Sequence, residues 1–585
     1  MKKYIFHGIG LIPESFRKQG IFVLILLTAG SLLDLFSLAT FIPLIILVIN
    51  PDRNLNNKYF SQLSDVTGFV DPTSFAVSFT ICALIFIFIK TQINIWITYK
   101  KAHYSYRIAG DFASRAMARY MQIPYQKFAN SDYTKEMNRI SNLPIVYANN
   151  YLIPLGTILS ESFMLMMLLL TITLYDPRVA LFIMLIILPI ALLYRIKRIK
   201  MKNLGQQIKQ KYPLLLKYTL QSIEGLPEIR VFKKEAFFKN RFTKTFNDLG
   251  VTFSKDHTAL TSSVRLTELI ATLCVSALII YALLLKQSPE KSILLLSIYA
   301  GVSFRAIPSI NRILAASLQI KTHDYIIPEL QQMMSPSNMS FDEPLPNLSF
   351  EKKIELQDIS FRHEGHPWIF ENASLAINKG EKVAILGKSG SGKTTLFLLM
   401  MGFIEAQKGE IKVDGVTIDN GNSSGLLRRI GYVPQSPYIL DDTLAENVAF
   451  GIPKENIDQN KIMALLRSLD LEAWANNLPL KLDTIMGEKG TKLSGGQRQR
   501  IAIARALYHE AEILLLDEIT NQLDRETEQD VIQILQNLNS LKKSVILITH
   551  KIELWKFFDS VYEVKNKRFE KLLTEELESI YLRHD

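Results

Sequence analysis

Six long apolar runs fill the first part of this 585-residue chain and constrain its fold more than any other feature. They lie at about residues 21–49, 74–98, 148–175, 178–196, 258–286 and 291–319. A helix needs about 20 apolar residues to cross the hydrocarbon core of a bilayer, and each run is near or above that length. The sequence therefore predicts six membrane-spanning helices, with both ends of the chain on one side. The first run is too long for the core of a signal peptide and is expected to be retained.

Positively charged residues predict the orientation of these helices. Many of them lie in two long loops, after the second and after the fourth run. Basic residues near membrane helices favour the cytoplasmic side, so both loops, and the chain after the sixth run, are predicted to be cytoplasmic. The residues concerned are Lys100, Lys101, Arg107, Arg115, Arg119, Lys127, Lys135 and Arg139, then Arg195, Lys197, Arg198, Lys200 and Lys202.

Composition argues against two classes of function. A net charge of +11 is compatible with nucleic-acid binding, but the basic residues flank apolar runs. We therefore expect a lipid bilayer as partner and no nucleic acid. The chain has two cysteines, Cys82 and Cys274, both inside apolar runs. They provide neither a disulfide framework nor the spacing of a metal site.

The last 240 or so residues have a different character, because short apolar strands alternate there with helical patterns. Val383 to Leu386, Ile513 to Leu516 and Val545 to Ile548 are such strands. This alternation is typical of a parallel sheet covered by helices. We expect a six-helix, all-α transmembrane domain over residues 1–325, a linker rich in turn formers over 326–349, and an α/β domain with a phosphate-binding loop over 350–585.

The sequence GKSGSGKT follows the first of these strands and has the form of a phosphate-binding loop. Its glycines allow close approach of the backbone, whose N–H groups surround phosphates. Lys393 is expected near the β and γ phosphates of ATP, and the Thr394 hydroxyl on Mg²⁺. The nucleotide-binding residues predicted in this loop are Gly387, Ser389, Gly390, Ser391, Gly392, Lys393, Thr394 and Thr395.

Three more segments predict ATP hydrolysis. Asp517 ends the strand of ILLLDE and is expected to hold Mg²⁺, together with Thr394 and Gln435. Glu518, the next residue, is placed to polarise the attacking water. Gln435 and His550 are expected to sense the metal and the γ-phosphate. The predicted catalytic residues are Glu518, His550 and Gln435, and the predicted cofactors are ATP and Mg²⁺.

The sequence LSGGQ, Leu493 to Gln497, followed by Arg498-Gln499-Arg500, resembles the signature of the ATP-binding cassette transporters, and the resemblance covers nearly the whole chain. It implies a half-transporter that works with a second copy of the same chain. Ser494, Gly495, Gly496 and Gln497 would then complete the nucleotide site of the partner. Gly487 to Gly490 resembles a loop of exporters in this family, which implies outward transport.

Two positions depart from the family pattern. His363 stands where many members have a tyrosine that stacks on adenine. This departure implies either stacking by imidazole or a weaker contact with the base. The loop after Glu518 is unusual at 519–522, although Asp524 is kept as a nucleotide-site residue. The resemblance also implies short force-transmitting helices at the tips of the two cytoplasmic loops, near Ser131 to Arg139 and near Glu224 to Phe232.

Ionisable residues inside the apolar runs bear on the substrate, because charges at that depth normally line a cavity or pair with each other. They are Asp34, Glu161, Glu268, Arg305 and Arg312. One interpretation is a set of structural ion pairs. The other is that these residues contact substrate, with Arg305 and Arg312 binding an anionic headgroup such as a phosphate.

Apolar residues at helical spacing between Asn57 and Val70 predict a helix packed on the bundle or at the outer membrane surface. With the charged positions, this resembles the bacterial flippases of lipid-linked oligosaccharides, which implies a location in the bacterial cytoplasmic membrane. The alternatives are a general exporter of lipids, drugs or peptides, and an ATP-gated channel or regulatory module. The complete set Lys393, Glu518, Ser494 and His550 argues against the last of these.

Overall fold

The computed structural model of the protein describes residues 8–39, 72–175, 177–284, 289–333, 348–419, 423–519, 543–573 and 575–577. The chain divides into two compact units. The helical unit comprises Met1–Ile123 and Ser131–Asn338, and the α/β unit comprises Pro124–Asn130 and Met339–Asp585. The predicted class, a helical domain followed by an α/β domain, is confirmed.

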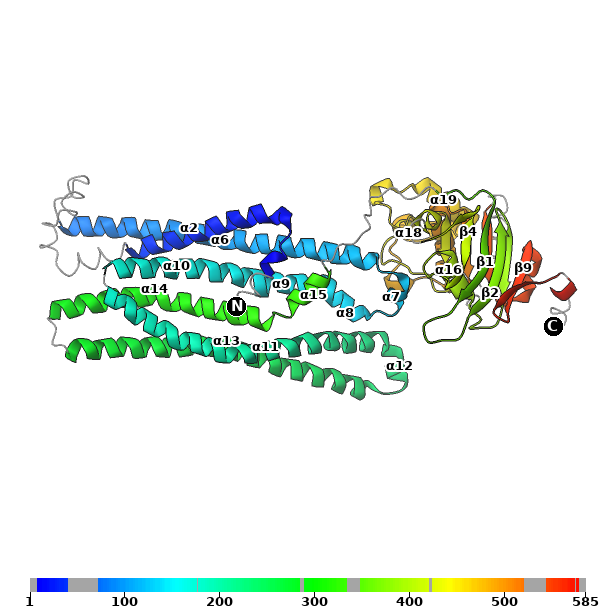
Figure 1. The fold of residues 1–585 in the computed structure, drawn as a ribbon. Helices are drawn as coiled ribbons and strands as arrows, with labels where there is room; N and C mark the ends of the chain where they lie inside the picture. Colours follow the sequence, from blue (N-terminus) through cyan, green and yellow to red (C-terminus); the bar gives the residue numbers. More distant parts are fainter. Residues whose placement is uncertain are drawn as a thin grey trace. The chain divides into compact units, whose positions relative to one another are not determined.

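Long helices lie side by side in the helical unit (Figure 1). Each predicted apolar run falls largely on one of them. Within the described residues, three segments are long and apolar enough to cross a membrane: Glu14–Ser37, Val77–Met121 and Tyr133–Thr171. The long helices on which the six predicted apolar runs fall are α2 (Glu14–Ala39), α6 (Pro72–Met121), α10 (Ile153–Tyr175), α11 (Pro177–Glu224), α13 (Glu235–Leu284) and α14 (Pro289–Thr322).

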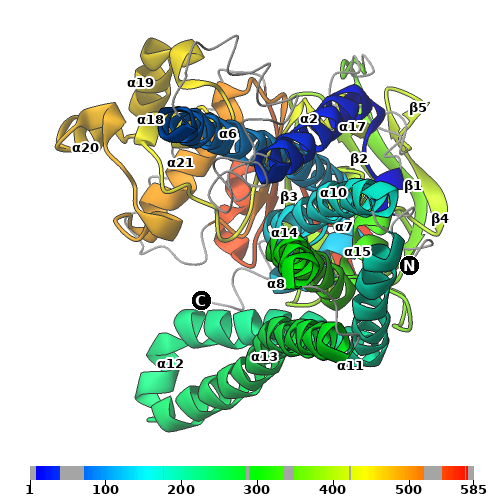
Figure 2. The ribbon, with the colours of Figure 1, turned by 90° about the vertical axis from the view of Figure 1, so that its left-hand side faces the viewer.

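Three of these helices extend well beyond the apolar runs. Helices α6 and α13 have 50 residues each and α11 has 48. At about 1.5 Å per residue, each is roughly 75 Å long, more than twice the hydrocarbon thickness of a bilayer. Helices α11 and α13 form a long hairpin that carries the short helix α12 (Leu226–Val231) at its end (Figure 2). Helix α12 lies within the predicted segment 224–232.

A cluster of aromatic and aliphatic side chains holds the end of the helical unit together. Tyr147 is fully buried, and its ring stacks on Phe112 and on Tyr151, with ring centres 5.4 Å and 5.3 Å apart. These residues belong to α6 and to a run of short elements before α10. The run consists of α8 (Tyr133–Met137), the π-helical turn η1 (Asn138–Asn142), α9 (Leu143–Tyr147) and the π-helical turn η2 (Ala148–Leu152).

The linker predicted over 326–349 is too wide at both ends. Helix α15 (Ile326–Met333) packs into the aromatic cluster through buried Ile326 and Leu330, so it belongs to the helical unit. Leu348 and Phe350 are buried in the core of the α/β unit. Residues 334–347 lie outside the described residues. The turn-forming residues that follow α15 made the whole stretch look like a linker. Helix α15 itself has buried and exposed positions, as expected for a packed helix.

Within its described residues, the α/β unit contains two sheets. A four-stranded antiparallel sheet has the order β2-β1-β4-β5, and a six-stranded sheet has the order β10-β9-β3-β8-β7-β6. In the second sheet all neighbours are parallel except β9 and β10. The strands are β1 (Lys353–Phe361), β2 (Phe370–Asn378), β3 (Lys382–Leu386), β4 (Lys408–Val413), β5 (Val416–Thr417), β6 (Ile430–Val433), β7 (Ile513–Asp517), β8 (Ser544–Ile548), β9 (Ser560–Lys565) and β10 (Arg568–Lys571).

Strands β3, β7 and β8 are buried along their whole length, which explains why each appears in the sequence as a short continuous apolar run. They are central neighbours in the larger sheet. Their carboxyl ends therefore lie side by side, and the residues that follow them are brought to one edge.

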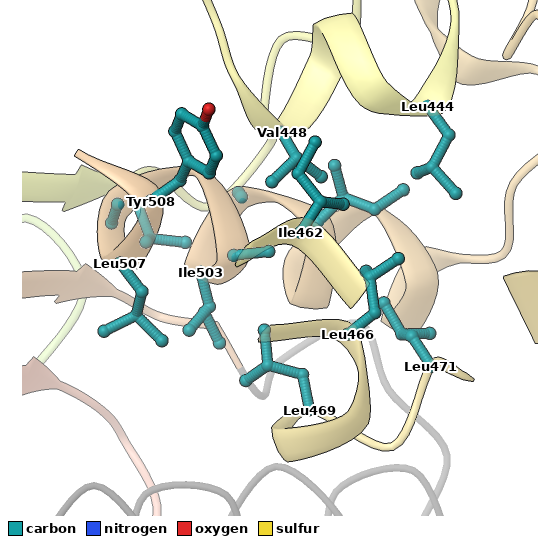
Figure 3. Packing of buried hydrophobic residues seen from close by; sticks show 14 of the residues in the cluster. Leu444, Val448, Ile462, Leu466, Leu469, Leu471, Ile503, Leu507 and Tyr508 are labelled. Carbon is teal, nitrogen blue, oxygen red and sulfur yellow. The ribbon is translucent and has the colours of Figure 1, made fainter. Parts of the chain in front are cut away.

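Helices cover the larger sheet and are locked to it by a continuous apolar core. Figure 3 shows side chains of α18, α19 and α21 interdigitating, with Val448, Ile462 and Ile503 among them. This core holds α21 in place and thereby positions the LSGGQ segment at its start. Among the described residues from 348 onward, the helices of four or more residues are α16 (Lys393–Met400), α17 (Ser423–Leu427), α18 (Leu444–Val448), α19 (Gln459–Ser468), α20 (Glu472–Asn476), α21 (Gly495–Tyr508) and the 3₁₀ helix η7 (Ile552–Phe557).

A segment from the first long loop belongs to the α/β unit. Helix α7 (Tyr125–Ala129) lies in this segment, and the Tyr125 ring stacks on Phe403 with ring centres 5.3 Å apart and planes 11° apart. A short helix is also present near Ser131 to Arg139, as predicted: those residues form α8 and η1 of the helical unit, where Arg139 pairs with Glu329 at 3.0 Å. The force-transmitting role of such helices remains a prediction. Helix α7 was not predicted, because its five residues are too few for a detectable helical periodicity.

Candidate active site

The loop between β3 and α16 is shaped by glycine. Gly390 and Gly392 have φ angles of 79° and 103°, in the left-handed region that side-chain-bearing residues rarely adopt. A Cβ atom on Gly392 would lie 2.3 Å from Cγ2 of Ile369 and 3.1 Å from Cζ of Phe370. Glycine is therefore required there by both backbone conformation and space. The loop wraps around the start of α16, whose first N–H groups have no helical partners and attract anions.

Lys393 begins α16 and lies almost fully buried inside this loop. Its Nζ donates hydrogen bonds to the carbonyl oxygens of Gly387 at 2.8 Å and Lys388 at 3.0 Å. Burial lowers the pKa of Lys393, and the carboxylates of Glu518 and Asp517 oppose this effect. The ammonium is thus held by the loop, on the side that faces the two acidic residues.

The remaining loop residues fit a phosphate ligand. The hydroxyl oxygen of Ser391 is buried and has no hydrogen-bond partner within the described part of the chain. A buried hydroxyl without a partner is costly, and a phosphate oxygen would satisfy it. Ser389 is exposed and Thr395 is half-buried at the rim. All the predicted loop residues therefore belong to one continuous cradle around the start of α16.

Thr394 and Asp517 form the pair expected to hold Mg²⁺. The Thr394 hydroxyl donates to Oδ2 of Asp517 at 3.2 Å, across 123 residues of sequence. Burial raises the pKa of Asp517 above its usual value, while the hydrogen bond from Thr394 opposes the shift. A hydroxyl and one carboxylate are hard oxygen ligands, and Mg²⁺ in phosphate sites is typically held by one or two carboxylates together with the phosphates. The donor set fits Mg²⁺.

Tyr432 at the end of β6 is a neighbour of this pair that the sequence did not single out. Its hydroxyl lies 3.5 Å from Oδ2 of Asp517. Burial raises the pKa of Tyr432, with a further contribution from Asp517, so the phenol remains a hydrogen-bond donor. The sequence does show a tyrosine after the glycine of the short strand IGYV. Only the pairing of β6 with β7, however, shows that this tyrosine lies beside Asp517.

Glu518 lies at the centre of the cluster. Its Oε1 is 2.8 Å from Nε2 of His550, and its Oε2 accepts a hydrogen bond from Nε2 of Gln435 at 3.1 Å. Lys393 Nζ lies 3.9 Å from the same carboxylate and 3.3 Å from the His550 ring. The three predicted catalytic residues are thus brought together. Gln435 contacts Glu518, whereas its predicted role as a metal ligand remains a prediction.

The backbone of Glu518 is held in an unusual conformation. Its φ angle is 48°, in the left-handed region, which costs roughly 1–3 kcal/mol for a residue that is not glycine. Its N–H donates to the carbonyl oxygen of Ile548 at 3.0 Å, which ties it to strand β8. Strained backbone that is over-determined by its surroundings is common at functional sites. The turn aims the carboxylate at His550.

The LSGGQ segment forms the start of α21. Ser494 caps the helix: its hydroxyl accepts the N–H of Gln497 at 3.2 Å, and its own N–H donates to Oε1 of Gln497 at 2.9 Å. Gly495 and Gly496 follow in the first turn. Gln499, for which the sequence predicted no role, donates through Nε2 to the carbonyl oxygen of Gln435 at 2.7 Å. It connects α21 to the residue that contacts Glu518.

His363 occupies an exposed turn between β1 and β2. Its ring meets the ring of Phe361 edge-on, with centres 5.2 Å apart. Strand β2 begins close to the phosphate loop, because the side chains of Ile369 and Phe370 border Gly392. The stacking of His363 on adenine remains a prediction. Asp524 lies outside the described residues.

The ionisable residues inside the helical unit pair with one another. Asp34 accepts hydrogen bonds from Asn94 at 2.9 Å, pairs with Lys90 at 3.0 Å, and also pairs with Arg305. Glu161 and Arg312 form a bidentate pair, with distances of 2.6 Å and 3.1 Å.

The fifth predicted residue, Glu268, lies 3.3 Å from Arg265, and both side chains are well exposed. These contacts agree with the interpretation as structural ion pairs. The segment from Asn57 to Val70 lies outside the described residues.

Two protein-family models match the chain. The model described as "ABC transporter" matches residues 370–521, and the model described as "ABC transporter transmembrane region" matches residues 20–304. The first match contains the phosphate loop, the LSGGQ segment and Glu518. The second contains most of the helical unit.

Similar curated proteins include an uncharacterised ABC transporter ATP-binding protein of Bacillus subtilis, 31% identical over 60% of this chain and 60% of the relative. An ATP-dependent lipid A-core flippase of Saccharophagus degradans is 30% identical over 60% of this chain and 58% of its own length. The chain thus spans about three-fifths of these relatives. Another lipid A-core flippase, from Mannheimia succiniciproducens, is 27% identical over 84% of both chains.

A solved structure with a similar fold is that of a bacterial Atm1-family ABC exporter with ATP bound. It superposes with a TM-score of 0.78 and covers 98% of this chain and 96% of its own, at 18% sequence identity. At this identity the likeness concerns the fold, which it matches in both the helical and the α/β unit.

Proposed function

Because this chain belongs to the ABC transporter family, we propose that it is an ATP-driven exporter that works as a homodimer. It would move an anionic lipid-linked substrate from the cytoplasmic to the outer side of the membrane, with a lipid-linked oligosaccharide as the favoured member of that class. The observation that carries the ATPase part is the convergence of Lys393, Glu518 and His550 at one edge of the larger sheet. The fused bundle of long helices supports transport.

The chemistry follows from what surrounds Glu518. Its carboxylate is oriented by His550 and Gln435, so it is positioned to accept a proton from an attacking water or to polarise it. Lys393 and the N–H groups of the loop stabilise negative charge on the phosphates as it develops. Mg²⁺, held by Thr394 and Asp517, would neutralise phosphate charge when bound.

A second copy of the chain is proposed because the LSGGQ segment has no evident task within its own site. Ser494 and Gln497 are occupied with each other in the cap of α21, which leaves the N–H groups of the first turn as anion donors. The resemblance to the family places that turn over the nucleotide of a partner. Each dimer would then contain two equivalent sites.

Bacterial relatives support a lipid substrate, and the proposal places the protein in the bacterial cytoplasmic membrane. Several relatives, including two at 27% and 30% identity, are named as flippases of lipid A-core.

The test of the substrate class is stimulation of ATP hydrolysis by the purified protein in nanodiscs. We expect polyprenyl-pyrophosphate oligosaccharide to raise the rate at least twofold above that with neutral amphiphilic drugs or peptides. Equal stimulation by all three would favour a general exporter.

Changing Arg305 to alanine separates transport from hydrolysis. Asp34 keeps Lys90 at 3.0 Å after the change, so its carboxylate stays paired and the bundle is expected to fold. If Arg305 contacts an anionic substrate in the transport cycle, transport falls more than basal hydrolysis, by on the order of tenfold for one lost charge-assisted hydrogen bond. Transport and hydrolysis are measured on the same proteoliposomes.

The matched control is the double change Arg305→Ala with Asp34→Asn, which removes both charges of the pair. Lys90, the other partner of Asp34, keeps its hydrogen bond to the Ser37 hydroxyl at 3.1 Å. Equal loss of transport and hydrolysis in Arg305→Ala, restored in the double variant, would show that the pair is structural. In that case the substrate would not contact Arg305.

Changing Tyr125 to alanine is expected to uncouple hydrolysis from transport. Tyr125 comes from the loop between α6 and α8 and stacks on Phe403 in the α/β unit. Loss of such an aromatic pair costs about 0.5–1.5 kcal/mol beyond the buried area. We expect several-fold less transport per ATP hydrolysed, with hydrolysis itself changed less than twofold. Tyr125→Phe, which keeps the ring, should behave like the wild type, and uncoupling by Tyr125→Phe would contradict the role of stacking.

A further inference from the structure

A hollow of about 520 Å³ lies between α11 and α13, apart from the nucleotide site. Figures 1 and 2 show the two helices side by side over this stretch. The wall contains three lysines and three hydroxyl groups and has no carboxylate among its lining residues. These polar residues are Lys197, Lys200, Ser254, Lys255, Thr258 and Ser262.

One lysine is built into the wall. Nζ of Lys197 donates to the carbonyl oxygen of Ala259 at 3.0 Å and to the hydroxyl oxygens of Ser262 at 2.9 Å and Ser263 at 2.8 Å. These three bonds use all three donors of the ammonium group. Lys197 therefore supplies a fixed positive charge whose three hydrogen-bond partners are neutral.

The other two lysines are exposed at the rim. In the part of the chain that the structure describes, no carboxylate lies within ion-pair distance of Lys200 or Lys255. Arg305 and Arg312, the cations that the sequence analysis favoured for an anionic headgroup, are instead engaged by Asp34 and Glu161. Unneutralised positive charge in the helical unit is thus found at this hollow, where an anion would complement it.

The hollow lies at the boundary of two apolar runs, where one run ends and the next begins. Lys197 directly follows the run at 178–196, and Thr258 begins the run at 258–286. This is the predicted cytoplasmic surface of the bilayer, where lipid headgroups lie. Ile196, Met201 and Val251 add apolar lining on the same hollow. A ligand with a charged group and an adjoining apolar chain matches both kinds of surface.

We propose that this hollow binds a phosphate or pyrophosphate group of an anionic lipid at the cytoplasmic membrane surface. The lipid source rests on the proposed function, since it names the first headgroup contact of the same substrate class. Lys200 and Lys255, with the hydroxyls of Ser254 and Thr258, provide donors to phosphate oxygens, while Lys197 contributes its charge. The absence of a carboxylate from the wall avoids repulsion. A ligand with a doubly charged pyrophosphate is favoured over a ligand with one carboxylate, because it can accept from more of these donors.

The test compares binding of undecaprenyl pyrophosphate, undecaprenol and inorganic pyrophosphate to the full-length protein in detergent, by native mass spectrometry. The variant is Lys200→Gln with Lys255→Gln, because both side chains are exposed and their loss leaves the Lys197 network intact. We expect undecaprenyl pyrophosphate to bind about 30-fold more weakly, from the attraction lost at two surface lysines. Binding of undecaprenol should change less than twofold.

The matched control is Lys202→Gln with Lys244→Gln, which removes the same charge from the same two helices outside the hollow. Unchanged binding in the Lys200/Lys255 variant, or an equal loss in the control, would overturn the proposal. Inorganic pyrophosphate binding as tightly as the lipid would overturn the lipid source. Transport of the same lipid by the wild type is measured in parallel in proteoliposomes. A wild-type protein that binds the lipid but fails to transport it refutes the proposed function and leaves this site standing.

Discussion

Replacement of Glu518 by glutamine is expected to lower ATP turnover by a factor of about 10²–10⁴ while ATP still binds, because a positioned general base contributes that much. The amide keeps the size of the side chain and its contact with Gln435, but it cannot accept the proton of the attacking water. His550, now 2.8 Å from Glu518, keeps a hydrogen-bonding partner. Turnover is measured by phosphate release, and binding by a fluorescent ATP analogue.

The control for this change is Glu570→Gln, an exposed glutamate on β10 of the same unit that contributes no contact to the site. Its turnover should match the wild type. Turnover of Glu518→Gln within a factor of three of the wild type would remove Glu518 from the chemistry. Loss of ATP binding in the same variant would show instead that the left-handed turn at 518 is damaged.

Replacement of Lys393 by alanine is expected to weaken ATP binding itself, by about 10- to 150-fold. The ammonium is held inside the loop by the carbonyl oxygens of Gly387 and Lys388, so it meets phosphate oxygens with little loss of side-chain freedom. Hydrogen bonds to charged groups contribute about 1.5–3 kcal/mol, which corresponds to that range. Binding is measured by calorimetry on the purified full-length protein.

Lys388→Ala is the natural control, since it removes the same charge from the same loop at an exposed position. It should bind ATP within threefold of the wild type. Equal weakening by Lys388→Ala and Lys393→Ala would mean that net charge, and not the buried ammonium, governs binding. The unfolding temperature of both variants shows whether the loop has kept its fold.

The nucleotide site was largely predictable because its residues come in contiguous motifs at the ends of buried strands. Lys393 and His550 follow β3 and β8, and Asp517 ends β7. These strands are neighbours in the sheet, so the meeting of the three residues follows from strand order. Tyr432 was missed because it belongs to no motif, and Gln499 follows the signature directly but was given no role. Their targets, Asp517 and the carbonyl of Gln435, depend on how β6 and α21 pack.

The pairing of the membrane charges could not be predicted from the sequence. Asp34 and Arg305 are separated by 271 residues, and hydropathy indicates that each is inside a span without indicating its depth or the face it occupies. Only helix packing shows that Asp34 faces both Lys90 and Arg305, and that Glu161 faces Arg312.

Short helices escaped prediction for a related reason. Helix α7 has five residues, too few for a periodic pattern, and its position depends on the single contact of Tyr125 with Phe403. Helix α15 has eight residues beside a stretch of turn formers, and its burial depends on the aromatic cluster around Tyr147. Local sequence carries little information about such elements, because tertiary contacts decide their structure.

The central claim is ATP-driven outward movement of an anionic lipid-linked substrate. The most direct measurement places the purified protein in proteoliposomes with polyprenyl-pyrophosphate oligosaccharide in the leaflet predicted to be cytoplasmic. ATP and Mg²⁺ are added on that side, and a membrane-impermeant enzyme on the other side detects the glycan. The account predicts movement by the wild type and none above background by Glu518→Gln. Robust ATP hydrolysis without movement, or equal movement by both proteins, would contradict it.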